Sequence, residues 1–178
     1  MNLFLQNIID QIKEAQIKLG YERETMRFYY MPATLQTLLH TEIATAEELC
    51  RFLETSDEYK DCVLGTLTFS VHAGRIEVLV PPEGAEYVGT KVTASPFLKE
   101  IILLFSKHHI GIEDVKEVFA HYDENYICKQ MPEGSDFDYV LYFPDGQVDV
   151  YYYCVKQEMG HLIYHRFLKK DYELLIAE

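Results

Sequence analysis

The N-terminal part of the chain places apolar residues at the spacing of an α-helix. The apolar positions are Phe4, Ile8, Ile9, Ile12, Ala15 and Leu19. Gly20 follows them and can end the helix, because glycine tolerates a left-handed backbone. An extended segment is expected at 26–30. Two further helices are expected, one that begins at Pro32 and one that runs from the capping-box pattern at Thr45 to about Glu54.

Residues 63–80 change to the pattern of a β-hairpin. Two runs rich in β-forming residues, Val63–Val71 and Arg75–Val80, flank the turn residues 72–74. Two more helices are predicted after the hairpin. One begins at the Ser95-Pro96 cap, and the other covers Ile112–His121.

The C-terminal part predicts a three-stranded meander followed by a helix. The strands are expected at Phe137–Phe143, Val148–Lys156 and His161–Phe167, and the helix at Lys169–Ala177. We therefore expect an α+β fold that forms a single domain over residues 1–178. Its antiparallel sheet would be built from the hairpin at 63–80 and the meander at 137–167, packed against several helices.

Strand pairing decides which side chains share a face of this meander. If Asp145-Gly146 is a two-residue turn, Val140 lies opposite Tyr151. If the second turn lies around 158–160, Cys154 lies opposite Ile163. Side chains alternate between the two faces. One face then collects an unusual set of phenols and charges: Tyr142, Tyr151, Tyr153, Tyr164, Arg166, Asp138 and Asp149.

This tyrosine face has one structural and two binding interpretations. The structural one, which we favour, is that the protein's own helices cover it and that Arg166 pairs with Asp149 or Asp138. If the face is open, Arg166 could clamp a carboxylate or phosphate of a ligand between tyrosines. It could also contact a protein partner or a second copy of the chain, since Tyr and Arg dominate many interfaces. We prefer the interface among these binding interpretations.

A second candidate is a pocket formed by Cys154, His161 and His165. A Cys–His arrangement can form a nucleophile or part of a metal site. No Gly-rich elbow or oxyanion loop accompanies it, so an aromatic core with an inert Cys154 is the simpler interpretation. His108 and His109 are explained as the end of a helix, where partly charged histidine complements the helix dipole.

The net charge of the chain limits the classes of partner that it is expected to bind. The chain has 178 residues, 29 acidic against 16 basic, and a net charge of −13. This argues against nucleic acid and against an anionic membrane surface. The helix–helix–hairpin order of residues 32–80 is that of a winged helix, which would be a nucleic-acid binder. However, the second helix carries Glu47, Glu48 and Glu54 against Arg51 alone, which disfavours that alternative.

Other signals are absent from the sequence. The four cysteines form no C-x-x-C pair, the N-terminus does not resemble a signal peptide, and no run approaches the roughly 20 apolar residues of a membrane span. Phosphate-loop, dinucleotide, zinc-protease, nucleophile-elbow and EF-hand patterns are missing. We expect a cytoplasmic binding protein without metal, cofactor or catalytic activity. A small-molecule enzyme or sensor that uses the Cys/His pocket is the alternative.

Four short segments carry a resemblance to a known family. They are Met26-Arg27-Phe28-Tyr29-Tyr30, Asp136-Phe137-Asp138-Tyr139, Tyr151-Tyr152-Tyr153-Cys154 and Tyr164-His165-Arg166-Phe167. With these the chain resembles an uncharacterised bacterial family, domain of unknown function 3877, from anaerobic gut Firmicutes. The resemblance extends over nearly the whole chain and implies a single bacterial domain. It brings no activity, ligand or catalytic residue with it.

Overall fold

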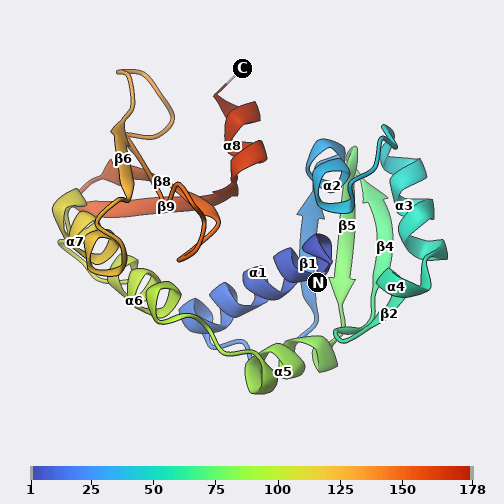
Figure 1. Cartoon of the computed structure of the whole chain (residues 1–178). Helices are drawn as coiled ribbons and strands as arrows, with labels where there is room; N and C mark the ends of the chain where they lie inside the picture. Colours follow the sequence, from blue (N-terminus) through green and yellow to red (C-terminus); the bar gives the residue numbers. More distant parts are fainter. Residues whose placement is uncertain (1, 177–178) are drawn as a thin grey trace. The chain divides into compact units, whose positions relative to one another are not determined.

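A computed structural model describes residues 2–176 of the chain. Its contacts divide the chain into two compact units, unit 1 at residues 1–93 and unit 2 at residues 94–178 (Figure 1). Each unit combines helices with its own antiparallel sheet, which confirms the α+β class. The single domain expected over residues 1–178 stays a prediction, and one cooperative unfolding transition for both units would support it.

Unit 1 contains more elements than the sequence pattern predicted. In chain order they are α1 (Leu3–Leu19), β1 (Met26–Tyr30), α2 (Pro32–Leu39), α3 (Ala46–Thr55), α4 (Asp57–Lys60), β2 (Asp61–Cys62), β3 (Gly65–Thr66), β4 (Thr68–His72), β5 (Arg75–Val80) and α5 (Pro82–Lys91). Strands β1, β5 and β4 form one sheet in that order, and the short strands β2 and β3 pair with each other. The elements α4, β2, β3 and α5 were not expected.

Local chemistry explains where the unit 1 elements begin and end. Helix α1 ends at Gly20, whose φ of 72° is left-handed. Helix α3 begins where the Thr45 hydroxyl accepts the backbone N–H of Glu48 at 3.3 Å. Strands β4 and β5 are joined by Ala73 and Gly74, both at positive φ, as a tight two-residue hairpin requires. The two helix boundaries were predicted and are confirmed. The hairpin is confirmed too, but its first strand begins at Thr68 rather than Val63 and includes His72, which was expected in the turn.

The core of unit 1 lies between its sheet and its helices. Alternate residues of β5, namely Ile76, Val78 and Val80, are fully buried. Helix α3 packs against β4 and β5 and buries Leu49 and Leu53. Since side chains alternate along a strand, the opposite face of this sheet carries the polar residues.

The order of elements in unit 1 is that of a winged helix. A helix, a strand and two helices precede the hairpin of β4 and β5, and β1 pairs with β5. The helix–helix–hairpin order expected from residues 32–80 is therefore confirmed, and β1 adds the third strand. Helix α4 and strands β2 and β3 form an insertion between α3 and the hairpin.

Unit 2 contains the predicted meander with one strand added. Its elements are α6 (Pro96–Phe105), α7 (Ile112–Tyr122), β6 (Ile127–Gln130), β7 (Tyr139–Tyr142), β8 (Tyr151–Glu158), β9 (His161–Leu168) and α8 (Lys169–Leu175). The four strands pair in chain order. The hairpin of unit 1 and this meander therefore lie in separate sheets, which corrects the expectation of one shared sheet. The hairpin also pairs with β1, and the meander also pairs with β6. Ala177, the expected end of the last helix, lies outside the described residues.

The pairing of β7 with β8 differs from the expected one. Val140 lies opposite Cys154 rather than Tyr151. The cause is Pro144, whose fixed φ suits the second position of a turn. The Gly146 N–H accordingly binds the Phe143 carbonyl at 3.2 Å, and the connection continues as a loop to the start of β8. The shift is an odd number of residues, so it moves every β7 side chain to the opposite face.

The pairing of β8 with β9 is shifted by two residues from the expected one. Cys154 lies opposite His165 rather than Ile163. The turn consists of Met159 and Gly160 at φ 48° and 80°, a two-residue hairpin loop. A shift of two residues keeps each side chain on its face, so the expected faces of β8 and β9 are confirmed.

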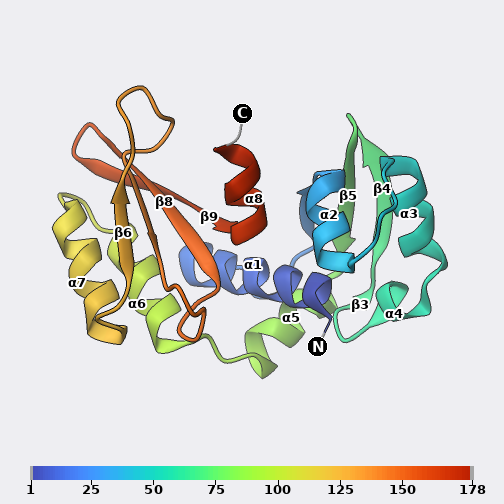
Figure 2. The same cartoon turned by 45° about the horizontal axis from the view of Figure 1, so that its top comes forward.

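Helices cover both faces of the unit 2 sheet (Figure 2). On one face, Phe97 of α6 and Phe119 of α7 pack edge-on against Tyr153 at ring-centroid distances of 5.8 and 5.4 Å. On the other face, Tyr172 of α8 joins a buried cluster with Val140 and Cys154. The tyrosine face predicted from the sequence is therefore an interior layer of unit 2.

Candidate functional site

The centre of the predicted tyrosine face is a buried ion pair. Arg166 of β9 and Asp149, two residues before β8, place a guanidinium nitrogen and a carboxylate oxygen 3.6 Å apart. Their side chains are only 6% and 7% exposed. Burial removes water from both charges, so each depends on the other and on its polar neighbours for compensation.

Two tyrosines of β8 complete this cluster. The guanidinium lies 4.1 Å from the centre of the Tyr151 ring and 5.5 Å from that of Tyr153. The Tyr153 hydroxyl donates to Asp149 Oδ2 at 3.0 Å, and the Tyr151 backbone N–H donates to Asp149 Oδ1 at 2.9 Å. Hydrogen bonds thus satisfy the Asp149 carboxylate. The ion pair and the cation–π contacts compensate the guanidinium charge, whose buried Nε makes no hydrogen bond to any described residue.

The same face is closed by helices α6 and α7. Tyr153 is fully buried, and Tyr164 stacks on Phe105 of α6 with ring centroids 4.1 Å apart. Arg166 thus pairs with Asp149 beneath helices α6 and α7, which is the arrangement of the structural interpretation. Tyr151, Tyr153 and Arg166 are therefore buried within unit 2, and a role of this face in binding stays a prediction.

Two residues assigned to this face lie elsewhere. Tyr142 belongs to the α8 side of the sheet, where its ring stacks on Tyr152 at 4.1 Å. The Asp138 carboxylate accepts the backbone N–H of Gln157 at 2.7 Å and so fixes the beginning of β7 to β8. Both misplacements follow from the odd shift of β7.

The proposed Cys/His pocket does not assemble. His165 lies opposite Cys154, but His161 lies opposite Glu158 at the end of the hairpin. Four residues of strand separate the two histidines by about 13 Å. Cys154 is fully buried, and burial raises the pKa of its thiol from 9.0 to about 12. A thiol that stays protonated and inaccessible is a poor nucleophile and metal ligand.

The polar face of the unit 1 sheet contains an internally satisfied network. The Glu77 carboxylate accepts from the Ser70 hydroxyl at 2.7 Å and the Tyr29 hydroxyl at 3.0 Å, and it lies 3.2 Å from the Arg27 guanidinium. The hydrogen bonds from Ser70 and then Tyr29 lower the pKa of this carboxyl. Because its neighbours already compensate the charge, the network does not require a ligand.

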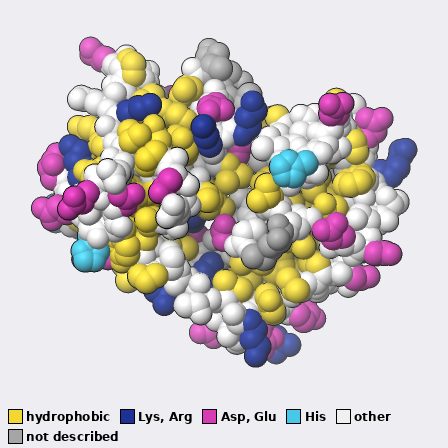
Figure 3. Space-filling model, in the orientation of Figure 1, with side chains coloured by type: hydrophobic (Ala, Val, Ile, Leu, Met, Phe, Trp, Pro, Cys, Tyr) yellow, Lys and Arg dark blue, Asp and Glu magenta, His cyan; other side chains and the backbone are white. Residues whose placement is uncertain are grey.

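A predominantly acidic surface lies on unit 1, around α3 and α4. Seven exposed carboxylates form what we call the acidic surface: Glu42, Glu47, Glu48, Glu54, Asp57, Glu58 and Asp61. Only Arg51 and Lys60 are basic between residues 40 and 63. Figure 3 shows acidic side chains along the margin where these helices lie. Phe52 of α3 is 37% exposed among them. The sequence signal for this surface was the run of glutamates in the second predicted helix.

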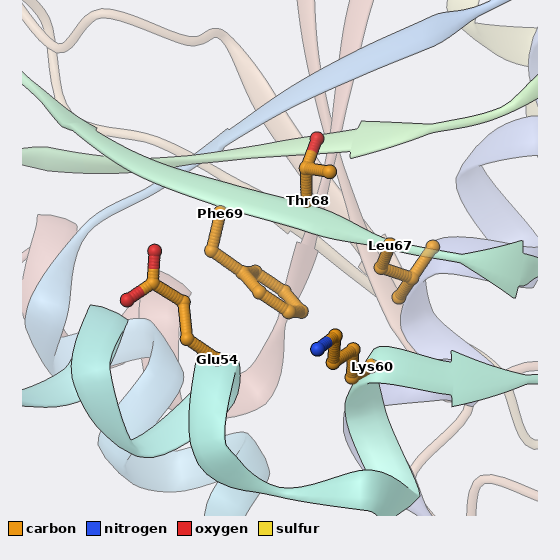
Figure 4. Close-up of a pocket in the computed structure, with 5 residues that line it drawn as sticks. All are labelled: Glu54, Lys60, Leu67, Thr68 and Phe69. Carbon is orange, nitrogen blue, oxygen red and sulfur yellow. The ribbon is translucent and has the colours of Figure 1, made fainter.

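A pocket of about 400 Å³ adjoins the acidic surface. Phe69 and Leu67 supply its apolar part, and Thr68 completes its β-strand side. Glu54 from the end of α3 and Lys60 from α4 lie on either side of the Phe69 ring (Figure 4). The pocket thus combines an aromatic wall with a carboxylate and an ammonium at its rim, and no sequence motif pointed to it.

None of the helices within residues 2–176 has both the length and the apolar character that a bilayer span requires. A family model described as "Domain of unknown function, E. rectale Gene description (DUF3877)" matches residues 1–176 of the chain. No curated protein and no solved structure matches it.

Proposed function

Since the chain belongs to the DUF3877 family, a family of unknown function, we propose a function from its surface: it acts by binding, and the acidic surface of unit 1 holds a basic segment of a protein partner. The observation that carries the proposal is the charge of α3. This helix stands where a winged helix presents its recognition helix, and its exposed residues include Glu47, Glu48 and Glu54.

Charge complementarity favours a cationic protein over nucleic acid. A recognition helix that reads DNA must come close to phosphates, and carboxylates at those positions repel them. The same carboxylates attract lysine and arginine, accelerate encounter and reject anionic competitors. The proposal therefore keeps the winged-helix order of elements but reverses the charge of the expected partner.

Apolar groups near the acidic surface offer contact area that a partner could bury. Phe52 offers exposed aromatic area on α3. The pocket at Phe69 places this ring between the Glu54 carboxylate and the Lys60 ammonium, so the ring and the Glu54 end of the rim suit the aliphatic stem and the cationic head of a lysine or arginine. Anchors of this kind provide most of the free energy of binding at protein interfaces.

A cytoplasmic setting is part of the proposal. It is supported by the four cysteines, all of which are free thiols in the structure. Free thiols persist in reducing compartments. Catalysis is left out of the proposal because the strongest nucleophile candidate, Cys154, is fully buried with a raised thiol pKa.

The proposal is tested by fluorescence anisotropy with three labelled probes: a lysine-rich peptide with interspersed leucines, the same peptide with glutamate in place of lysine, and a DNA duplex. We expect the wild-type protein to bind the lysine-rich peptide and neither of the other two probes. The double variant E47K/E48K should weaken this binding at least about tenfold, because two attractions become repulsions.

A matched control separates the acidic surface from the net charge of the chain. The double variant E113K/E117K makes the same charge change on exposed positions of α7 in unit 2. It should bind the lysine-rich peptide within about twofold of the wild type. Equal losses in the two variants would contradict a localised site, and preferential binding of the DNA duplex would replace this proposal with the nucleic-acid alternative.

A further inference from the structure

Two histidines that are distant in sequence meet at the end of the unit 2 sheet. His108 lies in the segment after α6, and His161 is the first residue of β9. Their Nδ1 atoms are 3.4 Å apart. The ring centroids are 5.1 Å apart and the ring planes meet at 75°. Both residues are exposed, so solvent and small solutes reach this end of the sheet.

The separation of the two nitrogens matches one edge of a tetrahedral metal site. Zinc binds imidazole nitrogen at about 2.0–2.1 Å, so two such ligands at the tetrahedral angle lie about 3.3–3.4 Å apart. An octahedral ion with similar bond lengths would bring neighbouring ligands to about 3.0 Å. With one ring protonated at Nδ1 the same separation is a long N–H···N hydrogen bond, which a bound ion would replace.

We infer that His108 and His161 form a two-ligand site for a tetrahedral divalent ion, with Zn²⁺ as the ion that fits. Imidazole nitrogen is a ligand that zinc prefers. Within residues 2–176 no third histidine, cysteine or carboxylate joins them as a ready group of metal ligands. Water therefore completes the coordination, and the site has one protein ligand fewer than catalytic zinc sites usually have.

A bound ion would connect two separate elements of unit 2. His108 continues from α6, which covers one face of the sheet, and His161 belongs to the β8–β9 hairpin. Bridging them removes freedom from the segment after α6 and from the end of the hairpin. Because the unfolded chain does not hold the two histidines together, zinc should bind the folded state preferentially and raise its melting temperature.

Zinc titration by calorimetry on the full-length, untagged protein tests this site. We expect one ion per chain for the wild type. Each of the variants His108→Asn and His161→Asn should bind Zn²⁺ at least about tenfold more weakly, since each removes one of two protein ligands. Their melting temperatures should no longer rise when zinc is added.

His109→Asn is the matched control. His109 neighbours the site in sequence and has a left-handed backbone at φ 59°, which asparagine tolerates. This variant should bind zinc like the wild type. X-ray absorption of the zinc complex should show nitrogen and oxygen ligands only. Unchanged affinity in both His108→Asn and His161→Asn, or a sulfur ligand in the absorption spectrum, would overturn the inference.

Discussion

Arg166 and Asp149 form an ion pair at 3.6 Å that is buried between the unit 2 sheet and its helices. The pair lies where sequence reasoning expected either an open binding face or a covered one. Its geometry explains why a layer rich in tyrosine can be an interior one. The Tyr153 hydroxyl and the Tyr151 ring compensate the charges, while the apolar bodies of the same side chains fill space.

Removing one member of this pair should destabilise unit 2 strongly. Arg166→Met leaves the Asp149 carboxylate buried without its cation, and Asp149→Asn leaves the guanidinium buried without its anion. Each change should cost about 3–5 kcal/mol of the free energy of unfolding. Urea denaturation followed by tyrosine fluorescence measures the loss.

The exposed pair Lys169–Glu173 on α8 provides the control. Its side chains are 69% and 49% exposed, so Glu173→Gln should change stability by less than about 1 kcal/mol. The double variant Arg166→Met/Asp149→Asn should recover part of the loss, because no unpaired charge remains. Equal effects of the buried and the exposed substitutions would contradict the interior position of the ion pair.

The turn between β8 and β9 should accept a stabilising substitution. Met159 is fully exposed and has a φ of 48°, a conformation that asparagine adopts more readily than methionine. Met159→Asn should raise the free energy of unfolding by roughly 0.5–1 kcal/mol. Met159→Val, β-branched at the same position, should lower it. A chemical denaturation series that gives the opposite order would contradict the two-residue hairpin turn.

The Cys154 thiol should be unreactive in the folded protein. It is fully buried, and desolvation raises its pKa to about 12. Iodoacetamide followed by peptide mass spectrometry should label the partly exposed Cys62 and Cys128 in the native protein. Cys154 should become labelled only in denaturant. Rapid labelling of native Cys154 would revive the Cys/His pocket.

The same thiol gives stability a defined pH dependence. Its pKa is higher in the folded state than the ordinary 9.0, so folding favours the protonated form. The contribution of this group is therefore fully present below pH 9.0 and is lost as the pH rises from 9.0 toward about 12. Cys154→Ala should lose less stability over this alkaline range than the wild type. An identical loss in both proteins would contradict the burial of the thiol.

Local signals in the sequence predicted much of the secondary structure. Gly20, the Thr45 capping box and the Ser95-Pro96 cap each lie at a helix end in the structure. Such signals act within a few residues, so they survive whatever the rest of the chain does. Strand β6 and helix α5 were missed because a four-residue strand and a helix interrupted by Gly84 and Gly89 have weak periodicity.

The sequence predicted the registers of strand pairing less well than the ends of helices. Asp145-Gly146 is a strong two-residue turn signal, but the preceding Pro144 prefers an earlier turn position and moves the pairing of β7. That single competition between neighbours placed Tyr142 and Asp138 on the wrong side. Which strands share a sheet is a non-local property, and no short segment encoded that the hairpin and the meander would separate.

The candidate sites also divide into features that local sequence predicts and features that depend on tertiary packing. The sequence gathered Tyr151, Tyr153 and Arg166 correctly, because β8 and β9 kept their faces. It did not show which helices would cover them, since covering depends on tertiary packing. Conversely, in the sequence the glutamates of α3 argue only against nucleic acid. That they form a binding surface follows from the tertiary structure, in which the end of α3 lines the pocket at Phe69.

The binding of a basic segment to unit 1 is tested most directly by NMR. Isotope-labelled full-length protein would be titrated with the unlabelled lysine-rich peptide while backbone amide shifts are followed. The account predicts saturable shifts concentrated in residues 42–69, around α3, α4 and the pocket, with unit 2 largely unchanged. Shifts centred on unit 2, or small shifts spread evenly over both units, would contradict it.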